Sequence, residues 1–205
     1  PLGTHSPNNT LERDLEHHAC LPCPPGTAGD DPTRLTCRAC DPGHYCTGCT
    51  TTTSPGHNDS LTYQGQQTCP WPALENLGGA QRGGDCKAGT YCPLGSSRQT
   101  PCPTGTFNNI TTRWNESQCS KCLTDSYNDL EGQKNCFPCG SSSFALPGST
   151  ICSCAGANRA FQKTDRKCIC EPGFEFFGEN MKMSEDDSAI DCQPVFYERC
   201  GSDQN

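Results

Sequence analysis

The sequence predicts a small disulfide-rich fold: an elongated tandem array of short disulfide-bounded loops, with little regular secondary structure beyond short two-stranded β-ribbons. The first observation is composition. Of 205 residues, 20 are cysteine, 21 glycine and 17 proline, which is typical of disulfide scaffolds. The second is the hydrophobic content, which is only 32% with cysteine included. Because this is too little for one large core, cross-links must replace the missing apolar contacts.

The third observation is a repeated cysteine spacing, clearest in CPTGTFNNITTRWNESQCSKCLTDSYNDLEGQKNCFPC at residues 102–139. Each loop opens with a cysteine, runs through polar residues and closes with another cysteine. A gap of two residues separates it from the next loop. An aromatic residue stands five positions after the opening cysteine, as at Phe107, Tyr127 and Phe144. Loops stabilised one by one contact mainly their neighbours, which predicts a line of modules.

A turn motif follows most of the opening cysteines. Glycine stands three positions after the cysteine in five motifs: Gly26, Gly43, Gly89, Gly105 and Gly173. Proline fixes φ and glycine accepts a positive φ, so the motif predicts a tight turn. We expect the turn to send the chain back across its own disulfide, so that Tyr45, Tyr91 or Phe107 packs on that disulfide. The first motif has Ala28 at the aromatic position.

The cysteine order predicts nine sequential disulfides, in which each loop closes on itself. They are Cys23–Cys37, Cys40–Cys46, Cys49–Cys69, Cys86–Cys92, Cys102–Cys119, Cys122–Cys136, Cys139–Cys152, Cys154–Cys168 and Cys170–Cys192. Sequence alone does not fix connectivity, and Cys46–Cys69 and Cys92–Cys102 are alternatives. Cys20 and Cys200 stay outside the ladder, and we expect them to pair beyond this segment or with each other.

Zinc binding is the competing interpretation of the cysteines. Two sets of CxxC pairs have zinc-ribbon spacing: Cys20/Cys23 with Cys37/Cys40, and Cys119/Cys122 with Cys136/Cys139. This spacing is one member of a varying series, and the turn motifs lie outside the pairs. Sequons also indicate an oxidising compartment. We therefore expect disulfides, with no metal and no cofactor.

Location and partners follow from sequons and charge. Four N-x-[ST] sequons predict N-glycans at Asn8, Asn58, Asn109 and Asn115. Together with the cysteines they predict the secretory pathway and an extracellular or cell-surface location. The net charge of −8 without a basic cluster argues against nucleic acid as a partner. No apolar run reaches membrane-spanning length, so we expect no membrane insertion by this segment.

Three stretches depart from the repeat. Residues 50–67 are polar and are predicted to be a loop glycosylated at Asn58 and on its threonines. The run GGAQRGG at 78–84 lacks the lysine of a phosphate-binding loop and is predicted to be a flexible linker. The acidic run EDDSAID at 185–191 lacks the ordered ligand pattern of calcium loops, which favours a solvated turn over a calcium site.

The motif C-P-x-G-T-[FY], followed by a loop and CxxC, resembles the ephrin-receptor-like cysteine-rich repeat and is similar to the loops of tumour-necrosis-factor receptors. Residues 86–107, CKAGTYCPLGSSRQTPCPTGTF, carry this resemblance most clearly. It covers residues 20–139 well and 139–192 loosely. The run CICEPGF at 168–174 resembles the end of an epidermal-growth-factor-like (EGF-like) module. The resemblance implies an elongated, non-catalytic ectodomain rod.

The expected organisation has six segments. They are a linker or tail of a preceding domain at 1–19, a first Cys-rich repeat at 20–49, an irregular glycosylated loop at 50–85, the second and third repeats at 86–139, an EGF-like hybrid at 140–200 and a tail at 201–205.

The expected function is a non-enzymatic extracellular spacer and protein-interaction module of a larger surface or secreted protein. Its partners would be neighbouring domains of the same chain or an extracellular assembly. The alternative is a ligand-binding segment of a receptor ectodomain. The five histidines form no arguable catalytic arrangement, so we expect no enzyme. Possible contact residues are Trp71, Phe174, Phe176 and Phe177, with Phe174 and Phe176 buried by alternation. Trp114 is expected to pack on a neighbouring loop.

Overall fold

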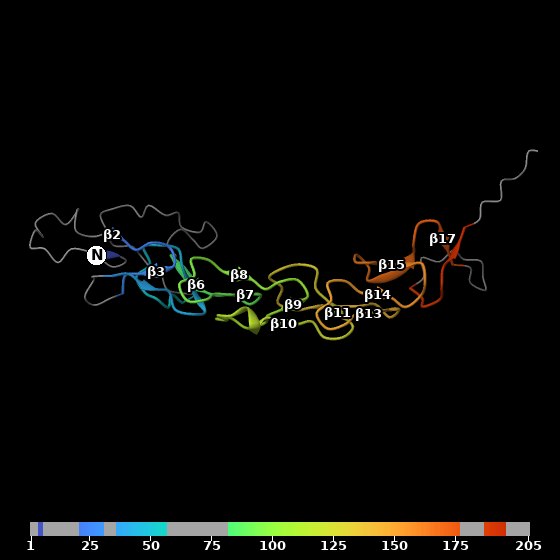
Figure 1. The fold of residues 1–205 in the computed structure, drawn as a ribbon, viewed down its shortest axis with the longest axis horizontal. Coiled ribbons are helices and arrows are strands. Elements are labelled where there is room, and N and C mark those ends of the chain that lie inside the picture. Colours follow the sequence, from blue (N-terminus) through green and yellow to red (C-terminus); the bar gives the residue numbers. More distant parts are fainter. Residues whose placement is uncertain (1–3, 6–20, 31–35, 57–81, 177–186, 196–205) are drawn as a thin grey trace, which may run out of the picture. The chain divides into compact units, whose positions relative to one another are not determined.

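The computed structural model describes residues 4–5, 21–30, 36–56, 82–176 and 187–195. Within these residues the strands are two to four residues long and pair as nine two-stranded ribbons. The described part contains no α-helix, only the 3-10 helix η2 at Glu116–Gln118. Figure 1 shows the short strands separated by loops along the chain. This is the disulfide-rich fold with little regular secondary structure that the sequence predicts.

Each ribbon pairs two strands that are consecutive along the chain. In order they are β1 (Thr4–His5) with β2 (Leu21–Pro22), β3 (Thr27–Ala28) with β4 (Arg38–Ala39), β5 (His44–Cys46) with β6 (Gly83–Asp85), β7 (Thr90–Tyr91) with β8 (Thr100–Pro101), β9 (Thr106–Phe107) with β10 (Ser120–Lys121), β11 (Ser126–Tyr127) with β12 (Phe137–Pro138), β13 (Ser143–Phe144) with β14 (Ser153–Cys154), β15 (Arg159–Gln162) with β16 (Lys167–Cys170), and β17 (Phe174–Glu175) with β18 (Gln193–Pro194).

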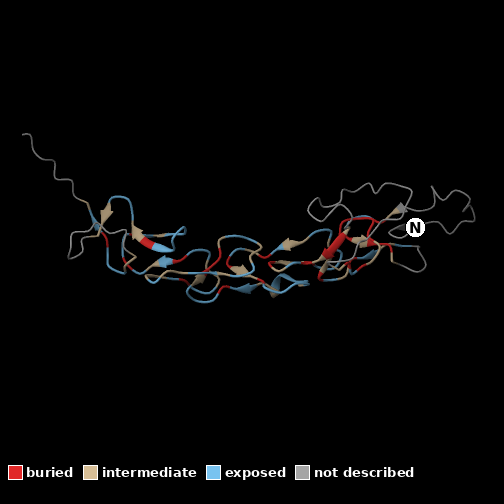
Figure 2. Ribbon diagram, turned by 180° about the vertical axis from the view of Figure 1, so that it is seen from behind, coloured by how far each residue is buried: buried red, intermediate tan, exposed pale blue. Residues whose placement is uncertain are grey.

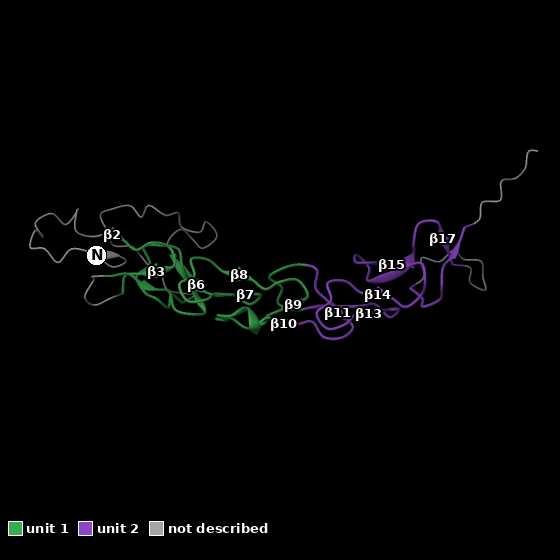
Figure 3. Cartoon of the chain, in the orientation of Figure 1, with its two compact units in different colours: residues 1–120, 130–135 green, residues 121–129, 136–205 purple. Residues whose placement is uncertain are grey.

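The chain divides into two compact units (Figure 3). The first comprises Pro1–Ser120 and Leu130–Asn135, and the second comprises Lys121–Asp129 and Cys136–Asn205. The segment boundary expected at 139/140 therefore lies within the second unit. Each unit is described by itself below.

Eight disulfides join described cysteines. They are Cys23–Cys37, Cys40–Cys46, Cys86–Cys92, Cys102–Cys119, Cys122–Cys136, Cys139–Cys152, Cys154–Cys168 and Cys170–Cys192. All eight belong to the sequential ladder, and they exclude the alternatives Cys46–Cys69 and Cys92–Cys102. Cys49 is also disulfide-bonded. Its predicted partner Cys69 lies outside the described residues, as do Cys20 and Cys200.

Cysteines form most of the buried apolar matter. Eleven of the fifteen buried hydrophobic residues that the structure describes are cysteines; the others are Ala28, Tyr45, Tyr127 and Ala145. Figure 2 shows that the buried stretches are short and interrupted by exposed ones. The disulfides therefore take the place of a continuous apolar core, as the composition predicts.

At three positions, the residue five places after an opening cysteine packs on the disulfide of a later loop. Ala28 clusters with Cys40 and Cys46. Tyr45 clusters with Cys86 and Cys92. In the second unit Tyr127 clusters with Cys152, with Cys139 packed against the same group. The prediction that Tyr45 lies on its own disulfide, Cys40–Cys46, is therefore wrong.

Strand register explains why these side chains pack on a later disulfide and not on their own. Ala28 pairs with Arg38, and Tyr127 pairs with Phe137; each partner directly follows the closing cysteine of its loop. The side chain therefore lies beyond its own disulfide and beside the chain that leads to the next opening cysteine. Tyr45 likewise pairs with Gly84, two residues before Cys86. This packing couples each loop to its neighbour.

Other aromatic residues are less buried than predicted. Trp114 is 52% exposed, so it is not buried on a neighbouring loop as expected, and Phe144 is 49% exposed. Tyr91 and Phe107 are partly buried.

The glycine-rich stretch before Cys86 is ordered structure at its C-terminal end. Gly83 and Gly84 belong to β6 and are buried, so the flexible-linker prediction is wrong for these two residues. A Cβ on Gly83 would lie 2.4 Å from the carbonyl oxygen of Tyr45. Glycine is needed here because β5 and β6 approach so closely.

Candidate functional site

Four of the turns after the opening cysteines share one hydrogen-bonding pattern. A threonine or serine in the fourth turn position donates both its N–H and its hydroxyl to the carbonyl oxygen of the first turn residue. This holds for Thr27 on Pro24, Thr90 on Lys87, Thr106 on Pro103 and Ser126 on Leu123, with hydroxyl distances of 2.6–2.8 Å. The sequence signal for this role was the recurrent threonine after glycine, which the turn prediction did not use.

The third residue of the turn, which is usually the glycine, also binds a later loop. The carbonyl oxygen of the third turn residue accepts a hydrogen bond from the N–H of a later opening cysteine, which is the next one along the chain except at Gly43, where Cys49 intervenes. The pairs are Gly26 with Cys40, Gly43 with Cys86, Gly89 with Cys102 and, in the second unit, Asp125 with Cys139, at 2.8–2.9 Å. Asp125 has φ of 57°, so a non-glycine residue also adopts the left-handed conformation at this position.

The carbonyl oxygen of an opening cysteine accepts a further bond from a residue that also has positive φ. The donors are Cys49 to Cys23, Gly95 to Cys40, Thr112 to Cys86, Gly132 to Cys102 and Gly148 to Cys122, at 2.8–2.9 Å. Their φ angles lie between 52° and 82°. These left-handed residues come from loops further along the chain.

The same left-handed residues lie against the turn glycines. A Cβ on Gly26 would be 2.4 Å from the carbonyl oxygen of Gly95. The corresponding distance from Gly43 to Thr112 is 2.5 Å. From Gly89 to Gly132 it is 2.0 Å. We call this three-part arrangement of turn glycine, later opening cysteine and left-handed residue a joint. The first unit has three complete joints.

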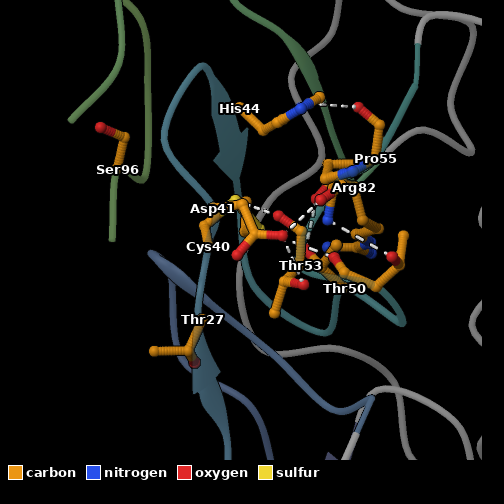
Figure 4. Close-up of a disulfide and its surroundings, with 12 residues drawn as sticks. Thr27, Cys40, Asp41, His44, Thr50, Thr53, Pro55, Arg82 and Ser96 are labelled. Carbon is orange, nitrogen blue, oxygen red and sulfur yellow. Dashed lines mark hydrogen bonds between the residues drawn. A yellow bond between two sulfur atoms is a disulfide. The ribbon is translucent and has the colours of Figure 1, made fainter. Parts of the chain in front are cut away.

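A polar cluster supports the first of these joints (Figure 4). The Thr53 hydroxyl lies 3.0 Å from carboxylate oxygens of both Asp30 and Asp41, and the Asp41 N–H donates to the Thr53 carbonyl. Ser54 also donates its hydroxyl to Asp41. The Ser54 hydrogen bond is the main cause that lowers the pKa of Asp41 below its usual value, against the opposing effect of burial.

Two threonines of the run at 50–53 therefore have a structural role. Thr50 is fully buried and Thr53 is 5% exposed. The Thr50 hydroxyl donates to the Arg82 carbonyl. Because both hydroxyls are buried and hydrogen-bonded, the predicted glycosylation of these two threonines is wrong.

The Asp41 carboxylate should make the stability of the first unit depend on pH. Its folded-state pKa is below the unfolded value of about 3.9, so its contribution is complete above about pH 5 and is lost as the pH falls through the folded-state pKa. Urea unfolding at a series of pH values should show a steeper loss of stability below about pH 5 for the natural chain than for Asp41→Asn. The exposed substitution Glu131→Gln should keep the natural slope, and equal slopes for all three would contradict the prediction.

In the second unit, a buried arginine fixes the segment 187–192. Arg159, in β15, is 6% exposed. Its guanidinium donates to the carbonyl oxygens of Ile190 and Cys168 and to the Ser188 hydroxyl. The ring of Phe176 lies 5.6 Å from the guanidinium carbon, which is cation–π distance.

The described acidic residues of this segment have local partners. Asp187 accepts from the Cys168 N–H at 3.0 Å and from the Ser141 hydroxyl at 2.7 Å. Burial tends to raise the pKa of Asp187, but these hydrogen bonds and the charge of Lys167 together lower it. Asp191 accepts from the Ala157 N–H at 2.8 Å. No group of three or more metal-ligating side chains occurs among the described residues.

The predicted contact residues are only partly described. Phe174 belongs to β17 and is half-buried, and Phe176 is half-buried as well. The ring of Phe176 lies against the guanidinium of Arg159. Phe177 and Trp71 lie outside the described residues. Sequence reasoning missed Arg159 because a single arginine in a polar stretch carries no signal of burial.

Two of the four sequons lie in the described part. Asn109 and Asn115 are exposed and belong to the Cys102–Cys119 loop. The Asn115 side-chain oxygen caps η2 by accepting from the Ser117 N–H at 2.9 Å. This bond leaves the amide nitrogen available for a glycan. Asn8 and Asn58 lie outside the described residues.

Chain secreted from a eukaryotic host should therefore carry N-glycans at Asn109 and Asn115. Enzymatic deglycosylation should convert both to aspartate in the Cys102–Cys119 peptide, each with the mass change of about one unit that amide hydrolysis gives. Asn108, which is buried and bonded to the Thr90 carbonyl, is the internal control and should stay unmodified. No mass change in this peptide would refute the prediction.

In comparisons with known proteins, no family model matches the chain and no curated protein matches it. In the part of the chain that the structure describes, no helix is long and apolar enough to cross a membrane. The dense disulfides indicate an oxidising environment.

Proposed function

We propose that the chain is a non-enzymatic extracellular spacer and protein-interaction module of a larger surface or secreted protein. The observation that carries this proposal is the repeated joint. In each complete joint, two main-chain hydrogen bonds and one close carbonyl contact fix three loops against one another. Side-chain packing of Ala28, Tyr45 and Tyr127 on the following disulfide adds a second connection between neighbours.

A spacer needs modules that resist bending and unfolding independently of one another. Main-chain joints supply resistance to bending because no side-chain rotation can release them. The disulfides supply local resistance because each loop is closed by its own cross-link. Both features repeat along the chain, as the ephrin-receptor-like resemblance would require. The dense disulfides further support the extracellular location.

Small-angle scattering of the oxidised chain tests the spacer proposal. A compact domain of this length would have a radius of gyration of roughly 17 Å. We expect a clearly larger value, because loops joined in series extend in one direction. The value should stay constant between low and high salt if the joints are rigid. A radius near 17 Å would overturn the proposal.

A further inference from the structure

The last turn of the described chain has two of the three parts of a joint. Gly173 has φ of +89°, and the Phe174 N–H closes the turn on the Glu171 carbonyl at 3.0 Å. The Gly173 carbonyl accepts from the Val195 N–H at 2.9 Å. In earlier joints this donor is a later opening cysteine.

Val195 therefore occupies the position of an opening cysteine. It follows Cys192 after a gap of two residues, as Cys40 follows Cys37 and Cys139 follows Cys136. The hydrogen-bonding geometry of the repeat is thus continued past the last described disulfide, with valine in place of cysteine.

The third part of this joint is missing among the residues that the structure describes. At Gly26, Gly43 and Gly89, a carbonyl oxygen lies where a Cβ would be. At Gly173, no described atom lies within 4 Å of that point. Positive φ alone does not require glycine in such a turn, as Asp125 shows. At the three complete joints, the close carbonyl requires it as well.

We propose that Gly173 and Val195 form an open joint that binds a further loop of the same repeat type. A residue in left-handed conformation on that loop would donate its N–H to the Val195 carbonyl. Its own carbonyl would pack on the Cα of Gly173. The occupant follows from continuity with the three complete joints, in which the corresponding partner is always such a loop residue. The inference rests on the proposed spacer function and names the partner of this end.

A loop pair of the chain itself, residues 122–152, can be used as a probe of the open joint. Cys122 and Gly148 are 26 residues apart, as are Cys86 and Thr112, and Gly148 donates to the Cys122 carbonyl. In the probe, residues 195–205 are replaced by a second copy of residues 122–152, so that the copied Cys122 takes the place of Val195. The copy brings both partners of two disulfides, Cys122–Cys136 and Cys139–Cys152.

Three versions of this extended chain are compared by disulfide mapping and hydrogen exchange: unchanged, Gly173→Asn and Glu171→Asn. Asparagine tolerates positive φ, but its Cβ fills the place required by the incoming carbonyl. We expect both copied disulfides in the unchanged version, with exchange of the copied loop about tenfold slower than in Gly173→Asn. The exposed substitution Glu171→Asn changes the same turn without blocking the joint and should exchange like the unchanged version.

Three outcomes would overturn the proposal. One is equal exchange of the copied loop in the Gly173→Asn and unchanged versions. Another is failure of the copied loop to form its disulfides when Gly173 is present. The third concerns the natural chain, in which Gly173→Asn should leave exchange of residues 154–176 unchanged. Faster exchange there would show that the chain's own residues already fill the joint. None of these outcomes depends on the radius of gyration, so the spacer proposal can fail separately.

Discussion

Replacing Gly89 by alanine is expected to lower the free energy of unfolding by about 2 to 5 kcal/mol, whereas Gly173→Ala should cost only about 1 to 2 kcal/mol. Both glycines occupy the same turn position, with φ of +92° and +89°. Both substitutions therefore carry the same left-handed strain. The two substitutions differ in the room that the new Cβ would find. A Cβ on Gly89 would lie 2.0 Å from the Gly132 carbonyl oxygen, whereas a Cβ on Gly173 would have no described atom within 4 Å.

Urea unfolding of the oxidised variants measures the two costs. Hydrogen exchange should show which amides are affected by the larger loss of stability, that of Gly89→Ala. In Gly89→Ala, the amides of Cys102 and Gly132 should exchange faster, because their bonds to the Gly89 and Cys102 carbonyls hold the joint closed. In Gly173→Ala, these amides should be unaffected. Equal destabilisation by the two substitutions would show that φ strain alone matters and that the close contact of the joint does not.

Much of the disulfide pattern was predictable because it is local. The described pairs close loops with sequence separations of 6 to 22 residues. Their Cα atoms are 5.7–5.9 Å apart, within the range that a disulfide spans. A tight turn after each opening cysteine favours such short closures. Composition, spacing and turn chemistry therefore all indicated the same ladder.

The joints were harder to predict because their third member carries no constant sequence signal. Gly95 lies in CPLGS and could have been recognised as another turn of the C-P-x-G-[ST] kind. Thr112 and Cys49 adopt the same left-handed conformation without being glycine. Their conformation depends on hydrogen bonds to distant opening cysteines, which single-loop reasoning does not contain.

The packing of Tyr45 was misassigned for a related reason. Its position after the turn indicated correctly that it would be buried, but burial does not say against which disulfide. That choice is made by strand register, which pairs Tyr45 with Gly84 across a long insertion. A register of this kind cannot be deduced from the turn itself.

Arg159→Met is expected to destabilise the second unit by about 2 to 4 kcal/mol. Methionine keeps much of the buried volume but removes every donor. The carbonyls of Ile190 and Cys168 would each lose a hydrogen bond. The Cys170–Cys192 disulfide would still tether the segment, so we expect local loosening rather than detachment. Exchange should therefore accelerate at the Cys192 amide, which donates to the Ala157 carbonyl.

Lys163→Met is the matched control for this substitution. Lys163 directly follows β15, the strand that contains Arg159, and makes an ion pair with Asp129 at 2.7 Å, but its side chain is 48% exposed. Exposed ion pairs contribute about 0.2 to 1 kcal/mol, so the control should change stability little and leave exchange in 187–192 unaltered. Both variants lose one positive charge, but only Arg159→Met loses buried hydrogen-bond donors. A difference in stability between them therefore measures the effect of the buried donors. If Arg159→Met left exchange at Cys192 unchanged, the 187–192 segment would have to be held by its other contacts, which are the hydrogen bonds of Asp187, Asp191 and Cys192 and the disulfide.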